Sequence, residues 1–501
     1  MRGGSVRPPG GIDTSTPHVS AVIVLAAGQG TRMRSSRPKV MHELAGRPMV
    51  WHAISAAASL QPEILVAVIG HGRDEVEAYV SRAHDLPTVV LAVQEDQFGT
   101  GHAVASALRV TGDLTGTVVV TYGDVPLLSP GTLASLVHEH DRSGNAITVL
   151  TASLDDPTGY GRIVREPDGA FTAIVEHREA SPDQLSIDEI NSGVYAFNGP
   201  ALTRILSQLA ADNAQGERYL TGAVALARAA GEQVGTLQTS DPGEIEGVND
   251  RVQLATMARR LNDRLVRNAQ LSGVTVDDPA TTWLHVDVTI GPDTQIRPNT
   301  HLEAGTTIGS GCVIGPDTTL SACAVGDGAV VQRSYCQRSE IGDRCAVGPF
   351  AHLRAGSVLH EEAEVGAFVQ VKQATIGAGV KAHHLAYLGD ATIGDHANIG
   401  AGAITANYDG VHKSRTIVGD HAFIGSNATL VAPITIGDGA YVAAGSAITN
   451  SVNAGDLAVA RGHQHNSSGW VAKRRPNSPA AVAAASADAN GATTSSEGIT
   501  P

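Results

Sequence analysis

The sequence predicts two kinds of architecture in one chain: an α/β domain built on a parallel sheet, followed by an all-β prism. The first is indicated by short apolar runs that alternate with helical patterns over residues 20–248. The second is indicated by an aliphatic residue that recurs at every sixth position from Ile290 onward. A chain of 501 residues is too long for one ordinary core, which agrees with two or three domains.

Apolar runs in the first region are typical of buried strands, and the segments between them are typical of helices. The expected strands are residues 21–25, 64–69, 88–93, 117–122 and 146–152, and the expected helices are residues 49–60, 74–83 and 133–142. Because strands and helices alternate, we expect a doubly wound parallel sheet, in which ligands bind beyond the carboxyl ends of the strands.

A helical arm is expected over residues 249–273, between the two architectures. Its apolar residues are spaced as one face of a helix, and these are Leu254, Ala258, Leu261 and Leu265. The prism is then expected over residues 274–470. Residues 1–19 and 471–501 have a low-complexity composition and are expected to be disordered.

A six-residue period fits neither a helix nor a sandwich, but it fits a coil with flat faces. Each hexapeptide would form one short strand and one corner, and three would complete a coil, with the aliphatic residue pointing inward. The repeat starts at Ile290, Ile296, Leu302, Ile308, Ile314, Leu320, Ile341, Val347, Leu353, Leu359, Val365, Ile393, Ile399, Ile424, Leu430, Ile436 and Val442. Residues 405–416 interrupt it and are expected to leave the prism as a loop.

The composition limits the class of partner and the compartment. A net charge of −15 argues against a nucleic-acid binder or a protein of anionic membranes. No segment resembles a signal peptide or reaches the ~18 apolar residues of a membrane span. The cysteines are few, and none is spaced as CxxC, which argues against a zinc site and favours a reducing compartment; they are Cys312, Cys323, Cys336 and Cys345. We expect a cytoplasmic protein.

The first apolar run ends in LAAGQGTRM, residues 25–33, which is typical of a phosphate cradle. It lacks the third glycine of the dinucleotide-binding pattern and the GK[ST] ending of the Walker pattern. Small residues at the carboxyl end of a strand nevertheless expose backbone N–H groups, and Arg32 and Lys39 add cations. For the glycines alone, a plain tight turn would be equally probable.

Asp124 is the candidate metal ligand. It follows the apolar run 117–122, at the sheet edge where the cradle also lies. Mg²⁺ typically binds one or two protein oxygens together with phosphates and water. Asn249 is a second candidate, although an asparagine at a helix start is usually a cap.

LAAGQGTRM followed by PKV resembles the signature of sugar-nucleotide pyrophosphorylases. Together with the hexapeptide repeat, residues 20–470 resemble the bacterial family of bifunctional N-acetylglucosamine-1-phosphate uridylyltransferases and glucosamine-1-phosphate N-acetyltransferases. The resemblance implies a Rossmann-like nucleotidyltransferase domain and a left-handed parallel β-helix that forms homotrimers with shared acetyl sites. It also implies Mg²⁺, UTP, acetyl-CoA, glucosamine-1-phosphate and N-acetylglucosamine-1-phosphate as ligands, and UDP-N-acetylglucosamine as a product that supplies peptidoglycan and, where present, lipopolysaccharide synthesis.

The resemblance also implies residue roles in the first domain. Arg32 and Lys39 would stabilise charge on the phosphates, and Asp124 and Asn249 would hold Mg²⁺. The UDP-sugar would be bound by Leu25, Ala26, Ala27, Gly28, Lys39, Gln94, Gly99, Thr100, Tyr122, Gly123, Asp124, Gly161, Glu176, Asn191 and Asn249.

In the prism, His384 would be the base that removes a proton from the amine before it attacks the thioester. The resemblance implies that the sugar phosphate is held by Arg354, Lys372, Tyr387, Asn398 and Lys413. It implies acetyl-CoA contacts at Ala401, Asn407, Tyr408, Ser426, Ala444 and Arg461. The chain departs from the family pattern at Gln370, where a glutamate is usual, and at Gly222, where an aspartate is usual.

Two alternatives stay open at this point. The chain could be a nucleotidyltransferase for another sugar or nucleotide, because related enzymes share the phosphate cradle. The prism could also serve only as a trimerisation scaffold, although a scaffold has no need of His384 beside a loop that carries Lys413.

Overall fold

The computed structural model describes residues 18–209 and 217–491. The chain divides into two compact units, residues 1–356 and residues 357–501, and each is described by itself. Most of the N-terminal segment that was expected to be disordered lies outside the described residues, and the first strand begins at Val19.

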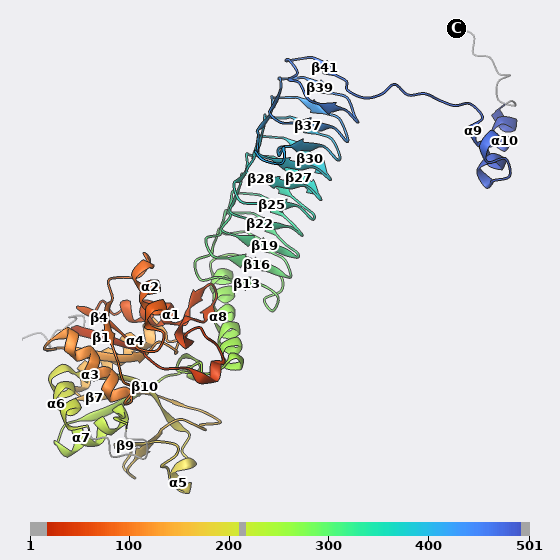
Figure 1. The fold of residues 1–501 in the computed structure, drawn as a ribbon. Coiled ribbons are helices and arrows are strands. Elements are labelled where there is room, and N and C mark those ends of the chain that lie inside the picture. The colour runs from red at the N-terminus through yellow and green to blue at the C-terminus, as the bar shows by residue number, and fades with distance from the viewer. Residues whose placement is uncertain (1–17, 210–216, 492–501) are drawn as a thin grey trace, which may run out of the picture. The chain divides into compact units, whose positions relative to one another are not determined.

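The N-terminal part of the first unit is built around one central sheet (Figure 1). Its strands lie in the order β11-β7-β10-β6-β1-β4-β5, and the β8–β9 hairpin joins β10 at the side. Their bounds are β1 Val19–Ala26, β4 Ile64–Ile69, β5 Val90–Val93, β6 Thr117–Tyr122, β7 Ile147–Ser153, β8 Arg162–Arg165, β9 Phe171–Val175, β10 Glu189–Asn198 and β11 Val234–Gln238. A separate two-stranded hairpin is formed by β2 (Glu43–Leu44) and β3 (Arg47–Pro48).

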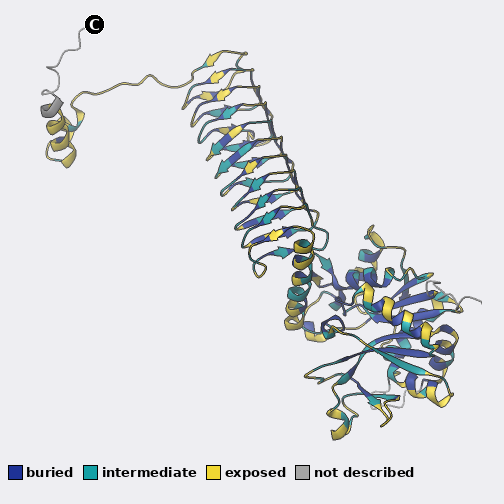
Figure 2. Cartoon of the chain, turned by 180° about the vertical axis from the view of Figure 1, so that it is seen from behind, coloured by how far each residue is buried: buried dark blue, intermediate teal, exposed yellow. Residues whose placement is uncertain are grey.

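Helices cover both faces of this sheet, because alternate residues of each buried strand point to opposite sides. Ala21, Ile23 and Leu25 of β1 belong to one apolar cluster, together with α3, α6 and α7. Val22 and Val24 belong to the other, together with α1, α2 and α4. The helices are α1 Met49–Ala58, α2 Arg73–Arg82, α3 Thr100–Thr111, α4 Pro130–Ser143, α5 Pro182–Leu185, α6 Gly199–Gln208 and α7 Ala223–Ala229, with 3₁₀ turns η1 Thr31–Met33, η2 Lys39–Met41, η3 Leu220–Gly222 and η4 Pro242–Glu244. Figure 2 shows the resulting buried centre of the sheet.

The prediction of an all-parallel sheet is wrong at β10 and at the β8–β9 hairpin that pairs with it. β10 runs antiparallel to both of its neighbours, β6 and β7, whereas β1, β4, β5, β6 and β11 are paired in parallel. The cause lies in the connection from β7 to β10, which contains the β8–β9 hairpin and the short α5. A parallel neighbour requires a crossover, usually a helix that packs across a sheet face, and residues 154–188 contain only this hairpin and the four-residue α5.

The arm is the single helix α8, Arg251–Leu271, and Asp250 caps its start by accepting hydrogen bonds from Val252 N and Gln253 N. Its apolar face covers a small cluster made by Met33, Leu44, Met49, Leu127, Val248 and Met257. Its other contacts reach the first coil of the prism, where Asn262 bonds to Thr282 O and Leu284 N and Arg259 stacks on Trp283.

The prism begins with three parallel strand stacks in residues 274–356. They run β12-β15-β18-β21-β24, β13-β16-β19-β22-β25 and β14-β17-β20-β23. The bounds are β12 Thr275–Val276, β13 Trp283–Leu284, β14 Thr289–Ile290, β15 Gln295–Ile296, β16 Thr300–Glu303, β17 Thr307–Ile308, β18 Val313–Ile314, β19 Thr318–Ser321, β20 Ala324–Val325, β21 Val330–Val331, β22 Tyr335–Gln337, β23 Ser339–Ile341, β24 Ala346–Val347 and β25 His352–Leu353.

The second unit continues with the same pattern. Its stacks run β27-β30-β33-β36-β39-β41, β28-β31-β34-β37-β40 and β26-β29-β32-β35-β38. The bounds are β26 Ser357–Leu359, β27 Glu364–Ala367, β28 Gln370–Lys372, β29 Thr375–Ile376, β30 Lys381–His384, β31 Tyr387–Gly389, β32 Ala391–Ile393, β33 Asn398–Ile399, β34 Ile404–Ala406, β35 Thr416–Val418, β36 Phe423–Ile424, β37 Thr429–Val431, β38 Ile434–Ile436, β39 Tyr441–Val442, β40 Ala447–Ile448 and β41 Leu457–Ala458. The expected excursion lies between β34 and β35, with a bridge from Tyr408 to Lys413.

The sequence period is visible in both burial and backbone geometry. The predicted inward positions are buried, for example Ile296, Leu302 and Ile314, and Ile290 in the first coil is an exception at intermediate burial. The corners also recur every six residues as positive φ angles, at Asp293, Asn299, Gly305, Gly311 and Asp317. Asparagine, aspartate and glycine are the residues that tolerate this conformation best.

The described part of the tail differs from the expectation of an unfolded segment, and residues 492–501 lie outside the described residues. The described part contains two helices, α9 (Trp470–Arg474) and α10 (Pro479–Gly491). Alanine has the highest helix propensity and proline suits the first helical position, and α10 begins with Pro479 followed by an alanine-rich stretch.

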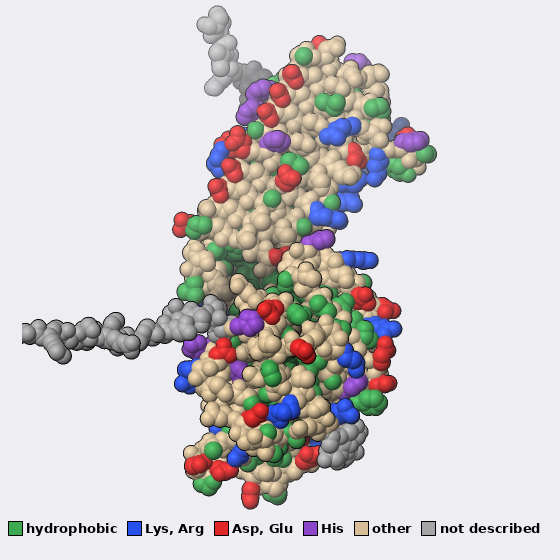
Figure 3. Space-filling view, turned by 90° about the vertical axis from the view of Figure 1, so that its left-hand side faces the viewer, with side chains coloured by type: hydrophobic (Ala, Val, Ile, Leu, Met, Phe, Trp, Pro, Cys, Tyr) green, Lys and Arg blue, Asp and Glu red, His purple; other side chains and the backbone are tan. Residues whose placement is uncertain are grey.

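Two observations bear on partners. None of the helices in the described residues combines the length and the apolar character that crossing a membrane requires. On the face drawn in Figure 3, basic and acidic side chains of the described N-terminal domain are interspersed rather than separated into areas of one sign.

Candidate active sites

A cavity of about 300 Å³ lies at the carboxyl end of β1 and β6, where the sheet topology predicts a ligand. Most of the residues expected to contact the nucleotide line it: Leu25, Ala26, Ala27, Gly28, Lys39, Gln94, Gly99, Thr100, Tyr122 and Asp124. An added Cβ at Gly28 would meet no protein atom within 4 Å, so this glycine leaves room on the cavity side. Gly30 differs, because its φ is 63° and a Cβ there would lie 2.5 Å from Lys39 Cβ.

A second cavity, of about 360 Å³, adjoins the first. It is lined by the other expected residues, Arg32, Gly161, Glu176, Asn191 and Asn249. Tyr122 and Asp124 line both cavities, so Asp124 stands where the two meet. Of the predicted UDP-sugar residues only Gly123 lines neither cavity, and its N–H donates to Leu25 O at 2.9 Å, which ties β6 to the cradle.

The two candidate metal ligands lie around one cation. Lys39 Nζ forms an ion pair with Asp124 Oδ2 and lies 3.3 Å from Asn249 Oδ1. Arg32 Nη2 donates to the same oxygen of Asn249 at 2.8 Å. Asn249 is held in turn by Gln253, whose Oε1 accepts a hydrogen bond from Asn249 N at 2.7 Å. One carboxylate oxygen and one amide oxygen therefore converge on a positively charged group.

Three of the predicted UDP-sugar residues, Gln94, Gly99 and Thr100, lie in or beside the loop before α3. Gln94 is buried, and its amide nitrogen donates to Gly99 O at 3.3 Å. Gly99 has a φ of 92°, and a Cβ there would lie 2.7 Å from Arg218 O. Thr100 Oγ1 accepts from Leu220 N at 3.0 Å, so the segment before α7 closes the same end of the cavity.

Glu176 and Asn191 both line the second cavity. Burial raises the pKa of Glu176, and Thr221 Oγ1 donates to its carboxylate at 3.1 Å. Asn191 is fixed by Tyr195 OH at 2.9 Å and by the N–H of Gly193 at 2.9 Å.

Gly193 has a φ of 82° and leaves space for the Tyr122 ring. A Cβ at this position would lie 2.7 Å from the ring. Burial also raises the pKa of Tyr122, which keeps its hydroxyl protonated.

Several lining residues were missed by the sequence reasoning. Gln97 lines the first cavity and donates to Ala27 O at 2.8 Å, and Tyr219 closes it with a pKa raised to about 12 by burial and by Glu217. Tyr160 and Gln253 line the second cavity. Gln97 lies between the predicted Gln94 and Gly99, and Tyr160 directly precedes the predicted Gly161, so both had a sequence signal.

In the second unit, His384 begins a column of residues along one edge of the prism. His384 is exposed at the end of β30, and its carbonyl accepts from Gly402 N at 3.2 Å. On successive coils Ala401 O accepts from Asn427 N, and Ser426 O accepts from Gly445 N. Arg461 Nη1 then donates to Ala444 O at 2.9 Å. Four of the predicted acetyl-CoA residues thus lie in line beyond His384: Ala401, Ser426, Ala444 and Arg461.

A second group lies at the next corner of the prism, after β28, β31 and β34 of successive coils. Lys372 Nζ is 3.7 Å from Asp390 Oδ2, and Asn407 Nδ2 donates to the same carboxylate oxygen. The Tyr387 ring covers Gly389, where an added Cβ would overlap the tyrosine hydroxyl. Asp390 was not predicted, although it ends the HLAYLGD motif, and it is the group that orders Lys372 and Asn407. Gln370, the departure from the family pattern, pairs with Tyr387 across β28 and β31.

Within the second unit, the predicted acetyl-site residues are spread over two strand stacks and the excursion. Within the described residues, no hydrogen bond or ion pair joins His384 to Lys372, and the positive φ of Leu385 turns the chain between their two strand stacks. Asn398 pairs with Lys381 on β30, and Lys413 lies in the excursion opposite Tyr408. Arg354 follows β25 in the first unit, where its carbonyl accepts from Ser339 Oγ at 3.4 Å.

Comparisons with protein families agree with this division of the chain. Residues 22–222 match the MobA-like NTP transferase domain, residues 284–381 match the GMPPB C-terminal domain, and residues 415–450 match the hexapeptide repeat of succinyl-transferase. The fold and the cavities therefore define a nucleotidyltransferase joined to a hexapeptide-repeat transferase.

Relatives that match nearly the whole chain carry one name, bifunctional protein GlmU. The protein of Kineococcus radiotolerans is 51% identical over 97% of this chain and 99% of its own length. Those of Streptomyces avermitilis and Mycolicibacterium gilvum are 52% and 51% identical over 93% of this chain, and over 96% and 94% of their own lengths. A solved structure of UDP-glucose pyrophosphorylase complexed with UDP-glucose covers 49% of this chain and 99% of its own, at 17% identity and a TM-score of 0.41, and is too distant to carry an argument.

The chain belongs to the GlmU family of bifunctional proteins. The predictions of a bifunctional transferase, of its family and of its two folds are confirmed. The alternative of a nucleotidyltransferase with a purely scaffolding prism is not favoured.

Proposed function

We propose that the prism transfers an acetyl group from acetyl-CoA to glucosamine-1-phosphate, and that the N-terminal domain then transfers uridylyl from UTP to N-acetylglucosamine-1-phosphate. The observation that carries the uridylyl half is the pair of adjoining cavities that share Asp124. One has the nucleotide-facing residues and the other the sugar-facing residues, so the two reacting phosphates would meet at this carboxylate. UTP and acetyl-CoA are cytoplasmic metabolites, and we place the protein in the cytoplasm, where its product supplies cell-wall synthesis.

Asp124 and Asn249 would hold Mg²⁺. Their oxygens suit this ion, and they already converge on a cationic group, the ammonium of Lys39. The described residues contain no cluster of three or more histidine, cysteine or acidic side chains, which fits an ion that takes only one or two protein ligands. When bound, Mg²⁺ would neutralise charge on the phosphates.

The chain's own residues account for the rest of uridylyl transfer. A phosphate oxygen of the sugar phosphate attacks the α-phosphorus of UTP, and the bond to pyrophosphate breaks. Lys39 and Arg32 stabilise the negative charge that accumulates on the phosphates. Gln94 binds the uracil edge, while Glu176 and Asn191 orient the sugar in the second cavity.

Acetyl transfer would use His384 as the base. Its imidazole removes a proton from the glucosamine ammonium and the freed amine attacks the thioester carbonyl. The carbon–sulfur bond then breaks, and the second proton lost from the nitrogen passes to the sulfur, so that CoA leaves as the thiol. Acetyl-CoA would lie along the column from Ala401 to Arg461. Because His384 and Lys372 lie at different corners of the prism and on successive coils, we propose that a homotrimer completes each acetyl site with residues of a neighbouring copy.

The test is an assay with glucosamine-1-phosphate, acetyl-CoA, UTP and Mg²⁺, with each component omitted in turn. UDP-N-acetylglucosamine should form only in the complete mixture. Supplying N-acetylglucosamine-1-phosphate should remove the need for acetyl-CoA but not for UTP or Mg²⁺. Product formation without acetyl-CoA from glucosamine-1-phosphate, or no nucleotide sugar from any mixture, would refute the proposal.

A further inference from the structure

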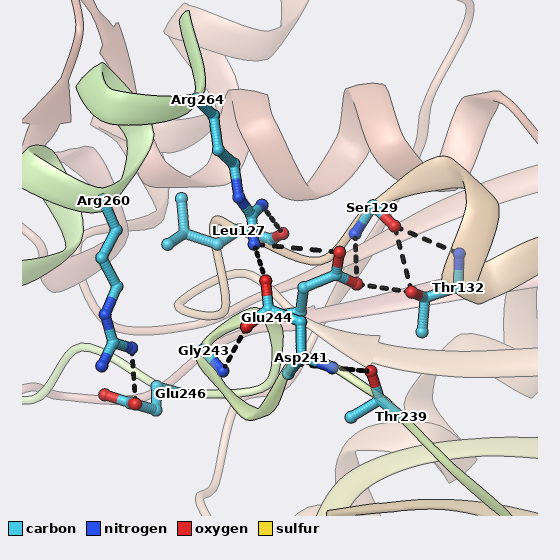
Figure 4. Close-up of polar contacts among 10 residues, drawn as sticks. All are labelled: Leu127, Ser129, Thr132, Thr239, Asp241, Gly243, Glu244, Glu246, Arg260 and Arg264. Atoms are coloured by element: carbon cyan, nitrogen blue, oxygen red, sulfur yellow. Dashed lines mark hydrogen bonds and ion pairs between the residues drawn. The ribbon is translucent and has the colours of Figure 1, made fainter. Parts of the chain in front are cut away.

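A cluster of polar contacts joins α8 to the two segments that carry the proposed metal ligands (Figure 4). One segment, residues 124–132, runs from Asp124 to the first turn of α4. The other, residues 239–249, runs through η4 to Asn249. Neither the proposed catalytic roles nor the proposed binding roles make use of this cluster.

Glu244 is the buried centre of the cluster, with 9% of its surface exposed. Its Oε2 accepts hydrogen bonds from Ser129 N at 3.3 Å and from Thr132 Oγ1 at 2.5 Å. Its Oε1 lies 3.8 Å from Arg264 Nη2. A buried carboxylate is unfavourable unless it is paired and hydrogen-bonded, so these partners fix the position of Glu244 against the start of α4.

Arg264 of α8 bridges the two segments directly. Its Nη1 donates to Leu127 O at 2.7 Å, and its Nη2 donates to Asp241 Oδ2 at 2.8 Å. The side chain of Leu127 is buried in the small apolar cluster under α8, which prevents its carbonyl from moving away. Asp241 is also the cap of η4, since its side chain accepts from Gly243 N at 2.9 Å. A planar guanidinium can satisfy such divergent acceptors at once, whereas an ammonium cannot.

Both proposed metal ligands lie a few residues from these contacts. Asp124 is three residues before Leu127, and Asn249 is five residues after Glu244. The segments meet again where Val248 N donates to Asp124 O at 2.9 Å. The two ligand-bearing segments are thus joined at two places. One is the hydrogen bond from Val248 to Asp124, and the other is the bridge through Arg264.

We propose that Arg264, together with buried Glu244, is a positioning residue that holds the Asp124 and Asn249 segments at the separation needed to bind the metal ion of uridylyl transfer. This inference rests on the proposed function. Arg264 touches neither substrate nor metal, and it acts by keeping the two ligand-bearing segments together.

The test compares Arg264→Met with Arg264→Lys and with a matched control, Arg260→Met. Arg260 lies one turn earlier on α8, and its ion pair within the described residues is with Glu246 at 2.5 Å, in the 239–249 segment only. Losing Arg260 therefore changes the same charge on the same helix without removing the bridge. The full-length enzyme is titrated with Mn²⁺ by electron paramagnetic resonance in the presence of UDP-N-acetylglucosamine. No turnover occurs in this mixture because pyrophosphate is absent.

Arg264→Met should weaken Mn²⁺ binding about tenfold, the lower end of the effect that outer-shell partners have on metal affinity. Its affinity for UDP-N-acetylglucosamine in EDTA and its acetyl transfer should stay within about twofold of the unmodified enzyme, as should Mn²⁺ binding by Arg260→Met. Arg264→Lys should restore part of the loss, since an ammonium can still reach one acceptor.

Unchanged Mn²⁺ binding by Arg264→Met would overturn the inference. So would an equal loss in Arg260→Met, or a parallel loss of UDP-sugar affinity in EDTA, because both would indicate general damage. If the unmodified enzyme binds no Mn²⁺ in its UDP-sugar complex, the proposed metal site itself is refuted, and that outcome is distinct from failure of the Arg264 bridge.

Discussion

The ammonium group of Lys39 is paired with the carboxylate of Asp124, and the same nitrogen lies 3.3 Å from Asn249 Oδ1. In this state the chain itself places a cation between the two proposed metal ligands. Lys39 is also the residue expected to contact the nucleotide phosphates. Binding of a metal–nucleotide complex would then require Lys39 to leave Asp124 and move to a phosphate.

Lys39→Met should therefore have opposite effects on metal binding and on catalysis. Mn²⁺ binding to the ligand-free protein should become tighter, because the competing ammonium is gone. Uridylyl transfer should fall by about 10²-fold, the usual effect of removing one donor that stabilises transition-state charge. Arg142→Met, which removes an exposed cation of α4 paired with Glu139, should change neither quantity. Equal or weaker Mn²⁺ binding by Lys39→Met would show that Lys39 does not compete with the metal.

Asp124→Ala should abolish uridylyl transfer and leave acetyl transfer intact. The carboxylate lies where the two cavities meet, whereas the proposed acetyl site lies in the prism. The two half-reactions are measured separately, with N-acetylglucosamine-1-phosphate and UTP in one assay and with glucosamine-1-phosphate and acetyl-CoA in the other. Chelation of Mg²⁺ should reproduce the same pattern in the unmodified protein. Loss of both activities in the variant would contradict independent sites.

His384→Ala should lower acetyl transfer by roughly 10²–10⁴-fold, the usual contribution of a general base, and should spare uridylyl transfer. The neighbouring His383 offers a matched control, because its ring bonds to Glu364 at 2.7 Å and takes no part in the proposed chemistry. His383→Ala should therefore keep most of the acetyl transfer. Equal losses in both variants would remove the special role of His384.

Local patterns predicted the elements, and the family resemblance implied many of the cavity-lining residues. The strand over residues 21–25 and the helical arm are found as β1 and α8, and the hexapeptide positions are buried. A second inward position, two residues before the aliphatic one, was missed. It is occupied by Thr294, Thr300 and Thr306, which are buried because their hydroxyls bond to backbone carbonyls.

The relationships that could not be predicted are those between residues far apart in sequence. Lys39 follows β1 and Asp124 follows β6, so their pairing depends on how far apart these two strands lie in the sheet. The antiparallel direction of β10 depends on what the β7–β10 connection packs against, which no local pattern encodes. The contact of Glu244 with α4 and Arg264 likewise joins three segments that show no common motif.

Gly46→Ala should destabilise the first unit more than Gly169→Ala. Both glycines have similar backbone angles, with φ of 83° and 88°, so the strain from a left-handed conformation is matched. A Cβ at Gly46 would overlap His285 Nδ1 of the first prism coil, whereas one at Gly169 would meet no atom within 4 Å. We expect an additional loss of about 1–3 kcal/mol at Gly46, as for other overpacked sites. Thermal unfolding of the two variants measures the difference, and equal melting temperatures would show that the Gly46–His285 contact is not tight.

Stability should fall as the pH is lowered from 7 to 5, because several histidines, His140 and His52 among them, resist protonation in the folded chain. His140 bonds to Thr148 Oγ1 at 3.0 Å and His52 bonds to Leu44 O at 3.0 Å, and burial lowers the pKa of both rings. Below the unfolded value of about 6.5 the unfolded chain binds more protons than the folded chain, so the free energy of unfolding decreases by up to about 1.4 kcal/mol per pH unit for each histidine. The free energy of unfolding continues to decrease until the pH reaches the lowered pKa of the histidine in the folded chain.

His140→Gln should be less stable than the unmodified protein at pH 7.5, but its urea midpoint should decline less between pH 7 and 5. The glutamine removes one of the groups whose protonation favours unfolding, while the buried amide keeps a polar partner for Thr148. His138→Gln, at an exposed position of the same helix, should keep the original pH dependence. If the midpoints of the unmodified protein and of His140→Gln decline in parallel, the buried imidazole of His140 is not a source of the acid sensitivity.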